Sequence, residues 1–141
     1  MSKNSKFIFI TCLFILLSQI SNASQSLNKT ETQSISLEQA TSFGFIPEID
    51  LQENNYGHIT FRITNPENVK NSKIEFASIL LFTYGQSITS SRMSEYNSNG
   101  KEYFFTQINK LVVDSVTVSV VCIDSNNNRY VYKFKVDLSA L

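Results

Sequence analysis

The sequence predicts an all-β protein, an antiparallel β-sandwich of about seven short strands preceded by a signal peptide that is cleaved. Apolar and polar side chains alternate along several segments of the second half of the chain. Clusters of Asn, Asp, Gly and Pro separate these segments, and an apolar run near the N-terminus follows two lysines. Alternation with a period of two is typical of strands that bury one face.

The composition excludes several functional classes. The 141 residues contain 12 Lys and Arg against 12 Asp and Glu, so the chain lacks the basic surplus of a nucleic-acid-binding protein. One His and two Cys cannot supply a metal cage that is rich in these residues. A hydrophobic content of 42% is too high for a disordered chain, and the length suits one domain.

Residues 1–23 have the order of regions expected of a secretory signal peptide. Lys3 and Lys6 precede an apolar run over residues 7–17. Ser21–Ala23 then has small residues at both positions that cleavage before Ser24 requires. The run is too short for a transmembrane helix, which needs about 20 apolar residues. We expect a secreted or periplasmic protein with no membrane span after cleavage. The cleaved chain keeps one cysteine, so it has no internal disulfide.

Residues 24–42 are dominated by Ser, Thr, Gln and Glu. We interpret this segment as a polar leader that is flexible at its start and becomes ordered near Ile35. The β-sandwich domain is then expected to occupy residues 43–141.

The first clear strand is predicted over residues 57–64, where Ile and Phe alternate with Thr and Arg. The turn formers at residues 65–68, one of which is a proline, end it. Residues 73–84 are apolar without a regular period. A short buried helix would fit there, but the flanking Asn and Gly and the aromatic residues favour a central strand.

Two hairpins are predicted next. The first joins residues 90–96 to residues 101–107 through a loop that ends in Asn99 and Gly100, a pair that favours hairpin turns. The second joins residues 114–123 to residues 129–138, and its alternation is the clearest structural signal in the chain. In its first strand one face is expected to carry Val116, Val118, Val120 and Cys122, and in its second strand one face is expected to carry Tyr130, Tyr132, Phe134, Val136 and Leu138.

The segments Val116–Asp124 and Tyr130–Val136 resemble the closing hairpin of the immunoglobulin-like domains of many secreted proteins. Asn127 and Asn128 stand where Gly-Asn is common in those domains, and the Trp and paired cysteines of antibody-type domains are missing. The resemblance implies an immunoglobulin-like β-sandwich with a binding or adhesive role.

We expect no catalytic residue, no metal ligand and no cofactor. His58 is the single imidazole, and nothing in the sequence pairs it with a nucleophile. A blue-copper centre needs two His with a Cys, whereas His58 and Cys122 supply one of each. Cys122 is expected to be a buried and unreactive thiol, because it continues the valine face of its strand.

The loop at residues 124–128 resembles the start of a calcium loop, because Asp and Asn recur at alternate positions. The sixth position is Arg129 where glycine is required, and the twelfth is Lys135 where a bidentate glutamate is required. We therefore interpret residues 124–128 as a hairpin turn.

The leading hypothesis is an exported, non-catalytic β-sandwich that binds another exported protein or a surface component. The alternative is a small secreted hydrolase that uses two carboxylates, drawn from Glu48, Asp50, Glu53, Glu67, Glu95 and Glu102. An aromatic cluster could form either core or a binding platform, and strand composition favours core. This cluster comprises Tyr84, Tyr96, Tyr103, Phe104, Phe105, Tyr130 and Tyr132.

Overall fold

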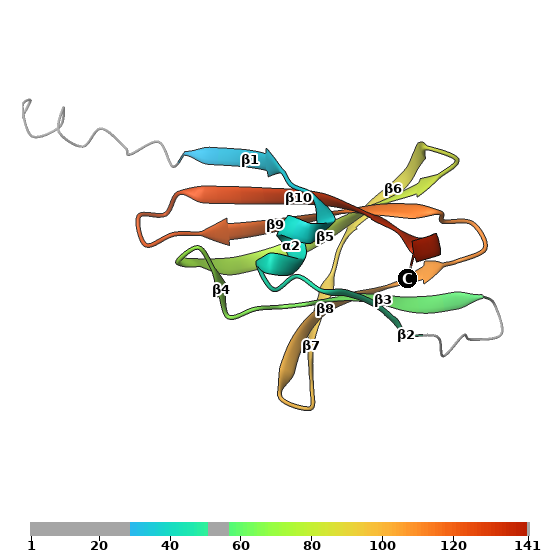
Figure 1. Cartoon of the computed structure of the whole chain (residues 1–141), viewed down its shortest axis with the longest axis horizontal. Coiled ribbons are helices and arrows are strands. Elements are labelled where there is room, and N and C mark those ends of the chain that lie inside the picture. Colours follow the sequence, from blue (N-terminus) through green and yellow to red (C-terminus); the bar gives the residue numbers. More distant parts are fainter. Residues whose placement is uncertain (1–28, 51–56, 141) are drawn as a thin grey trace, which may run out of the picture.

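The alternating segments form two β-sheets in the computed structural model, which describes residues 29–50 and 57–140 (Figure 1). The chain is all-β apart from one short α-helix and one 3-10 turn within these residues. The expected signal peptide and Glu53 lie outside the described residues. No helix in the described ranges is long and apolar enough to cross a membrane.

The larger sheet has six strands in the order β1-β10-β9-β5-β4, with β6 also paired to β5. Neighbouring strands are antiparallel except β1, which runs parallel to β10. Its strands are β1 (Thr30–Ser34), β4 (Asn68–Val69), β5 (Ser72–Thr83), β6 (Gln86–Arg92), β9 (Ser115–Ile123) and β10 (Arg129–Asp137).

The smaller sheet has four antiparallel strands in the order β2-β3-β8-β7. Its strands are β2 (Pro47–Asp50), β3 (His58–Thr64), β7 (Ser94–Ser98) and β8 (Lys101–Asn109). The strand predicted over residues 57–64 is confirmed as β3, and its alternate residues Ile59, Phe61 and Ile63 are buried.

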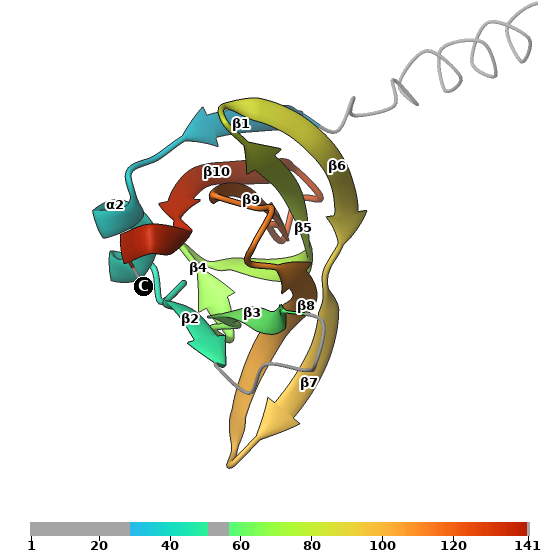
Figure 2. The same ribbon diagram turned by 90° about the vertical axis from the view of Figure 1, so that its right-hand side faces the viewer.

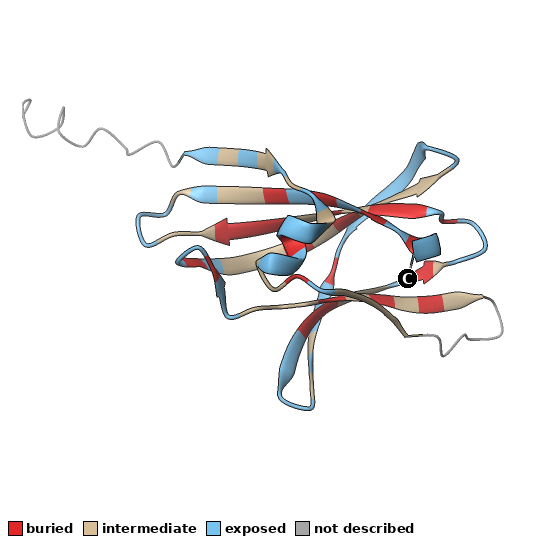
Figure 3. Ribbon diagram, viewed as in Figure 1, coloured by how far each residue is buried: buried red, intermediate tan, exposed pale blue. Residues whose placement is uncertain are grey.

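Both sheets contribute their inner faces to one apolar core. Phe61 and Phe104 come from the smaller sheet, and Val118 and Phe134 come from the larger one. Figure 3 shows the buried positions spaced along the strands rather than gathered at their ends. Because the inner faces are occupied by this core, the outer faces, the edges and the loops are left for interactions with other molecules.

The second predicted hairpin is confirmed as β9 and β10, with Val118 opposite Phe134 and Cys122 opposite Tyr130. Residues 72–83 form a strand, β5, and not the short helix that would also have fitted the sequence. This strand forms an antiparallel ladder with β9 along most of its length, which places it inside the larger sheet, as its apolar composition suggests.

The first predicted hairpin is correct at its turn and wrong in the extent of its first strand. Asn99 and Gly100 both have positive φ, of 52° and 76°, as a two-residue hairpin turn requires. Residues 90–96, expected as one strand, are divided at buried Met93 between β6 and β7, which belong to different sheets. Figure 2 shows β6 leading into β7 along one side of the molecule.

The segment expected to be a polar leader is ordered from Thr30 onward, so order begins before Ile35. Residues 30–34 pair with β10 through backbone hydrogen bonds, which do not require apolar side chains. The helix α2 (Leu37–Ser42) follows, and Ser36 and Gln39 cap it reciprocally through their side chains and backbone amides. Ala40 anchors this helix in the core.

Candidate functional site

His58, the single imidazole, begins β3 on the outer face of the smaller sheet, where it is half-buried opposite Asn109 of β8. Cys122 is fully buried in the core, and this burial raises the pKa of its thiol to about 11. The two residues therefore lie on different sheets and different faces. Across the described ranges no three His, Cys, Asp or Glu side chains gather as a metal-binding group.

Asp124 acts as the acceptor that closes the β9–β10 turn. Its carboxylate accepts hydrogen bonds from the backbone amides of Asn126 and Asn128, at 2.8 and 2.9 Å, and from the Asn128 side chain and the Tyr130 hydroxyl, at 3.0 and 3.2 Å. The Asn128 side chain is the largest cause of a lowered Asp124 pKa. The Asp124 carboxylate, which stands first in the calcium-like pattern of the sequence, is thus a turn acceptor in the structure.

The acids considered for hydrolysis are dispersed. Glu48 forms an ion pair with Arg62 at 2.7 Å on the outer face of the smaller sheet. Asp50 is at the end of β2. Glu67 and Glu102 line one shallow hollow, and Glu102 lines a second one together with Glu95.

The aromatic residues of β8 divide between the two faces of the smaller sheet. Phe104 is in the core, as alternation predicts. Tyr103 and Phe105 lie on the outer face and pack on Tyr96, with ring centroids 5.4 and 4.9 Å away. The Arg62 guanidinium lies 4.7 Å from the Tyr103 ring centroid and donates to the Tyr96 hydroxyl, which raises the Arg62 pKa.

Among the described residues, the three most exposed of the large apolar side chains lie at one end of the domain. Tyr84 is at the tip of the β5–β6 hairpin and is 96% exposed. Leu111 and Val112, which are 84% and 51% exposed, are in the β8–β9 loop. Figure 1 shows both connections at the same end of the molecule. We call Tyr84, Leu111 and Val112 the end patch.

Asp114 ties the two connections of the end patch together. Its carboxylate accepts a hydrogen bond from the Tyr84 amide at 2.5 Å and another from the Ser115 hydroxyl at 2.9 Å. The Asp114 amide donates to the Phe82 carbonyl at 3.0 Å, and the Asp114 carbonyl accepts from the Leu138 amide at 3.1 Å. One residue therefore fixes the hairpin tip, the loop and the C-terminal turn η1 (Leu138–Ala140) relative to one another.

Tyr84 adopts a left-handed backbone conformation, with φ of 46°, followed by Gly85 at 75°. This region costs a bulky residue about 1–2 kcal/mol, which Asn or Gly would largely avoid. The Asp114 hydrogen bond offsets part of this cost, since it holds the amide of the strained residue.

The β8–β9 loop is held by hydrogen bonds on both sides of Leu111. The amides of Val112 and Val113 both donate to the Asn109 carbonyl, and the Leu111 amide donates to the Asn109 side chain at 3.0 Å. Gly57 gives Leu111 its room, because a Cβ there would lie 3.0 Å from the leucine Cδ1. Val113 turns into the core, so its two apolar neighbours project outward.

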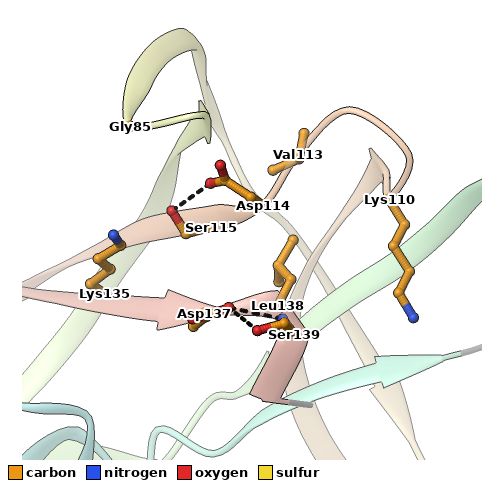
Figure 4. A pocket seen from close by; sticks show the side chains of 9 residues that line it. All are labelled: Gly85, Lys110, Val113, Asp114, Ser115, Lys135, Asp137, Leu138 and Ser139. Atoms are coloured by element: carbon orange, nitrogen blue, oxygen red, sulfur yellow. Dashed lines mark hydrogen bonds between the residues drawn. The ribbon is translucent and has the colours of Figure 1, made fainter.

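A shallow hollow adjoins the end patch (Figure 4). Charged side chains of both signs line it, with Lys110 from the β8–β9 loop and Lys135 and Asp137 from β10. Ser139 donates to the Asp137 carboxylate through its hydroxyl, at 2.7 Å, and its amide, at 2.9 Å, and these bonds lower the Asp137 pKa. The end of the domain thus combines a projecting apolar patch with a polar surround.

The sequence interpretation did not single out the end patch. The sequence contains one sign of this patch, the apolar run Leu111–Val113 in the connection between two strands. Only Val113 of this run turns to the core, which leaves the other two side chains exposed. The juxtaposition with Tyr84 depends on how the two loops fold together. Comparison with protein-family models and with curated protein sequences finds no match to this chain. The function is therefore inferred from geometry alone.

Proposed function

We propose that this protein is an exported, non-catalytic binding module that docks another exported protein through the end patch. Residues 1–23 serve as its signal peptide, and the mature chain begins at Ser24 in a secreted or periplasmic location. It needs no metal and no cofactor for this role.

The strand order supports an immunoglobulin-like sandwich. In such domains the first, second, fifth and fourth strands form one sheet, and the third, sixth and seventh form the other. Starting from β2, the chain follows this scheme, with β2-β3-β8-β7 in one sheet and β5-β9-β10 in the other. The strand β6 corresponds to the extra strand that variable-type domains add beside the third. Loops gathered at the ends of such sandwiches are frequent binding sites.

The exposure of the end patch is the observation that carries the proposal. A tyrosine that is 96% exposed and a leucine that is 84% exposed present apolar surface at one end of the domain, and apolar patches of this kind mark interaction sites. Tyrosine is also enriched among the residues that dominate binding energy at protein interfaces. Because Asp114 holds both loops, the patch is presented in one arrangement, and docking requires little further ordering.

The test compares partner capture by the wild type with capture by the double variant Tyr84→Ser, Leu111→Ser. These two proteins and the control below are each immobilised and exposed to the medium or envelope fraction of the producing cell, with chemical cross-linking. Ile46→Ser is the matched control, because Ile46 is 45% exposed and lies outside the end patch. We expect one partner retained by the wild type and by the control, and lost by the double variant. A partner retained by all three proteins would place the docking surface elsewhere, and no partner at all would contradict a binding role.

The alternative function, a secreted hydrolase that uses two carboxylates, is favoured by a different observation. Glu102 is shared by two neighbouring hollows, lined by Glu67 in one and Glu95 in the other. Inverting and retaining glycosidases both place two carboxyl groups on opposite sides of the bond that is cleaved. Release of sugar from a glycan panel by the wild type, abolished by Glu102→Gln, would establish this alternative over the binding role.

A further inference from the structure

The strand β6 is an open edge of the larger sheet, with little protection against pairing over residues 89–91. All seven of its residues are exposed, and residues 86–91 carry no charge and no proline. Proteins commonly protect such edges with charged residues, proline or a bulge. Among the other edge strands, β1, β2 and β7 each contain a glutamate, at positions 31, 48 and 95, and β4 has only two residues. In the described part of the chain, β6 has no strand partner on its outer side.

The backbone groups that face this open edge follow from one hydrogen bond. The Met93 amide donates to the Ala77 carbonyl at 2.9 Å, so this pair is of the hydrogen-bonded kind. Such pairs recur at every second residue of an antiparallel ladder, so Ser91 bonds to β5 while Ser90 directs its amide and carbonyl away from it. Arg92 is directed outward in the same way. Farther along, a bulge places Ile88 as an extra residue in β6, which limits the regular stretch to residues 89–92.

We propose that a second copy of the chain pairs with this edge, antiparallel, about a two-fold axis at Ser90. The Ser90 amide of each copy then donates a hydrogen bond to the Ser90 carbonyl of the other copy. Thr89 then faces Ser91 of the second copy, and Arg92 of the second copy lies beside the bulge at Ile88. The two six-stranded sheets would join into one continuous sheet across the axis.

A second copy suits this edge because the stretch pairs well with its own reverse. Hydroxyl side chains face hydroxyl side chains at the centre, a favourable cross-strand combination. The two Arg92 residues lie about 13 Å apart along the strands, beyond the screening length of about 8 Å at physiological salt. Each Arg92 guanidinium is already held 4.8 Å from its own Phe76 ring centroid. Its aliphatic stem is then available to cover Ile88 of the second copy, which is 46% exposed.

Ser90→Pro is the most direct test, because proline removes an amide hydrogen that β5 does not use. Ser90→Lys keeps the amide but sets two ammonium groups against each other across the axis. Ser90→Thr is the matched control, since it keeps both the amide and the hydroxyl. Sedimentation velocity of the mature chain from about 1 µM to about 1 mM follows the dimer over the range of weak to moderate affinities. Circular dichroism checks that each variant folds.

We expect a dimer for the wild type and for Ser90→Thr. For the proline and lysine variants we expect a dissociation constant at least about 10-fold higher, which is equivalent to about 1.4 kcal/mol. If the proline variant does not fold, the lysine variant decides the question. A wild type that stays monomeric over the whole range overturns the proposal, as does a dimer that survives Ser90→Lys. A dimer lost only in Tyr84→Ser, Leu111→Ser would move self-association to the end patch. Partner capture through the end patch is measured separately, so each proposal can fail without the other.

Discussion

Replacing Cys122 by alanine should change how the stability of this protein depends on pH. Cys122 is fully buried among apolar side chains, and this burial raises its pKa from the ordinary value of 9.0 to about 11. Between these values the thiol of the unfolded chain loses its proton while the thiol of the folded chain keeps it. Unfolding therefore releases a proton in this range, and the free energy of unfolding falls as the pH rises.

The size of this fall follows from the two pKa values. Each pH unit between 9.0 and about 11 lowers the free energy of unfolding by about 1.4 kcal/mol, so the full effect is about 2.7 kcal/mol. At about pH 10 roughly half of it, about 1.4 kcal/mol, is expressed. The contribution of the buried thiol is intact below pH 9 and is lost as the pH rises through the folded value.

Urea unfolding of the wild type and of Cys122→Ala, near neutral pH and at about pH 10, measures the effect. The other ionisable side chains are common to both proteins, so the difference between the two pH dependences reports Cys122. The variant starts less stable because it loses a buried sulfur, and the gap should narrow by about 1.4 kcal/mol at the higher pH. Parallel stability curves would refute the reasoning. So would rapid labelling of the native thiol by an aromatic disulfide reagent, because only the thiolate reacts.

Phe104→Ala should lower the free energy of unfolding by about 3–5 kcal/mol in urea denaturation, because Phe104 is 1% exposed in the core; a loss under about 1 kcal/mol would contradict the packing described. Asp124→Ala should lower the denaturation midpoint by removing the acceptor of the β9–β10 turn. Because the folded Asp124 pKa is lowered, wild type and variant should converge as the pH falls through it, and a gap that persists in acid would argue against this role. Ser36→Ala should cost about 1 kcal/mol and speed hydrogen exchange at the Gln39 amide, whereas unchanged exchange would show that the cap is dispensable.

The sequence predicted the strands best where burial alternates strictly. The β9–β10 hairpin, with Val118 and Cys122 on its inner face, agrees with the expectation because each inward residue meets the core. Residues 86–98 lack this contrast, since most of them are polar and exposed. The change of sheet at Met93 therefore leaves no periodic signal. The sign of this change in the sequence is one apolar residue, Met93, between polar neighbours, and an analysis of periodicity does not detect a single residue.

The N-terminal segment shows a different limit of the sequence interpretation. Its strand β1 is stabilised by backbone pairing with β10, which residue type hardly reveals. The helix α2 did carry a signal, the Ser36-to-Gln39 capping box, which the emphasis on composition passed over. For the end patch, tertiary contacts of Asp114 with Phe82 and Tyr84 bring the two loops together, so the sequence alone could not locate this surface.

The parallel pairing of β1 with β10 has a mechanical consequence. The first and last strands of the domain lie side by side and run in the same direction over the five pairs from Thr30 and Arg129 to Ser34 and Lys133. A pull applied to the two ends of the chain would slide these strands past each other, so their hydrogen bonds would share the load and would not open one at a time. We expect the paired strands to resist a stretching force applied between Thr30 and Asp137.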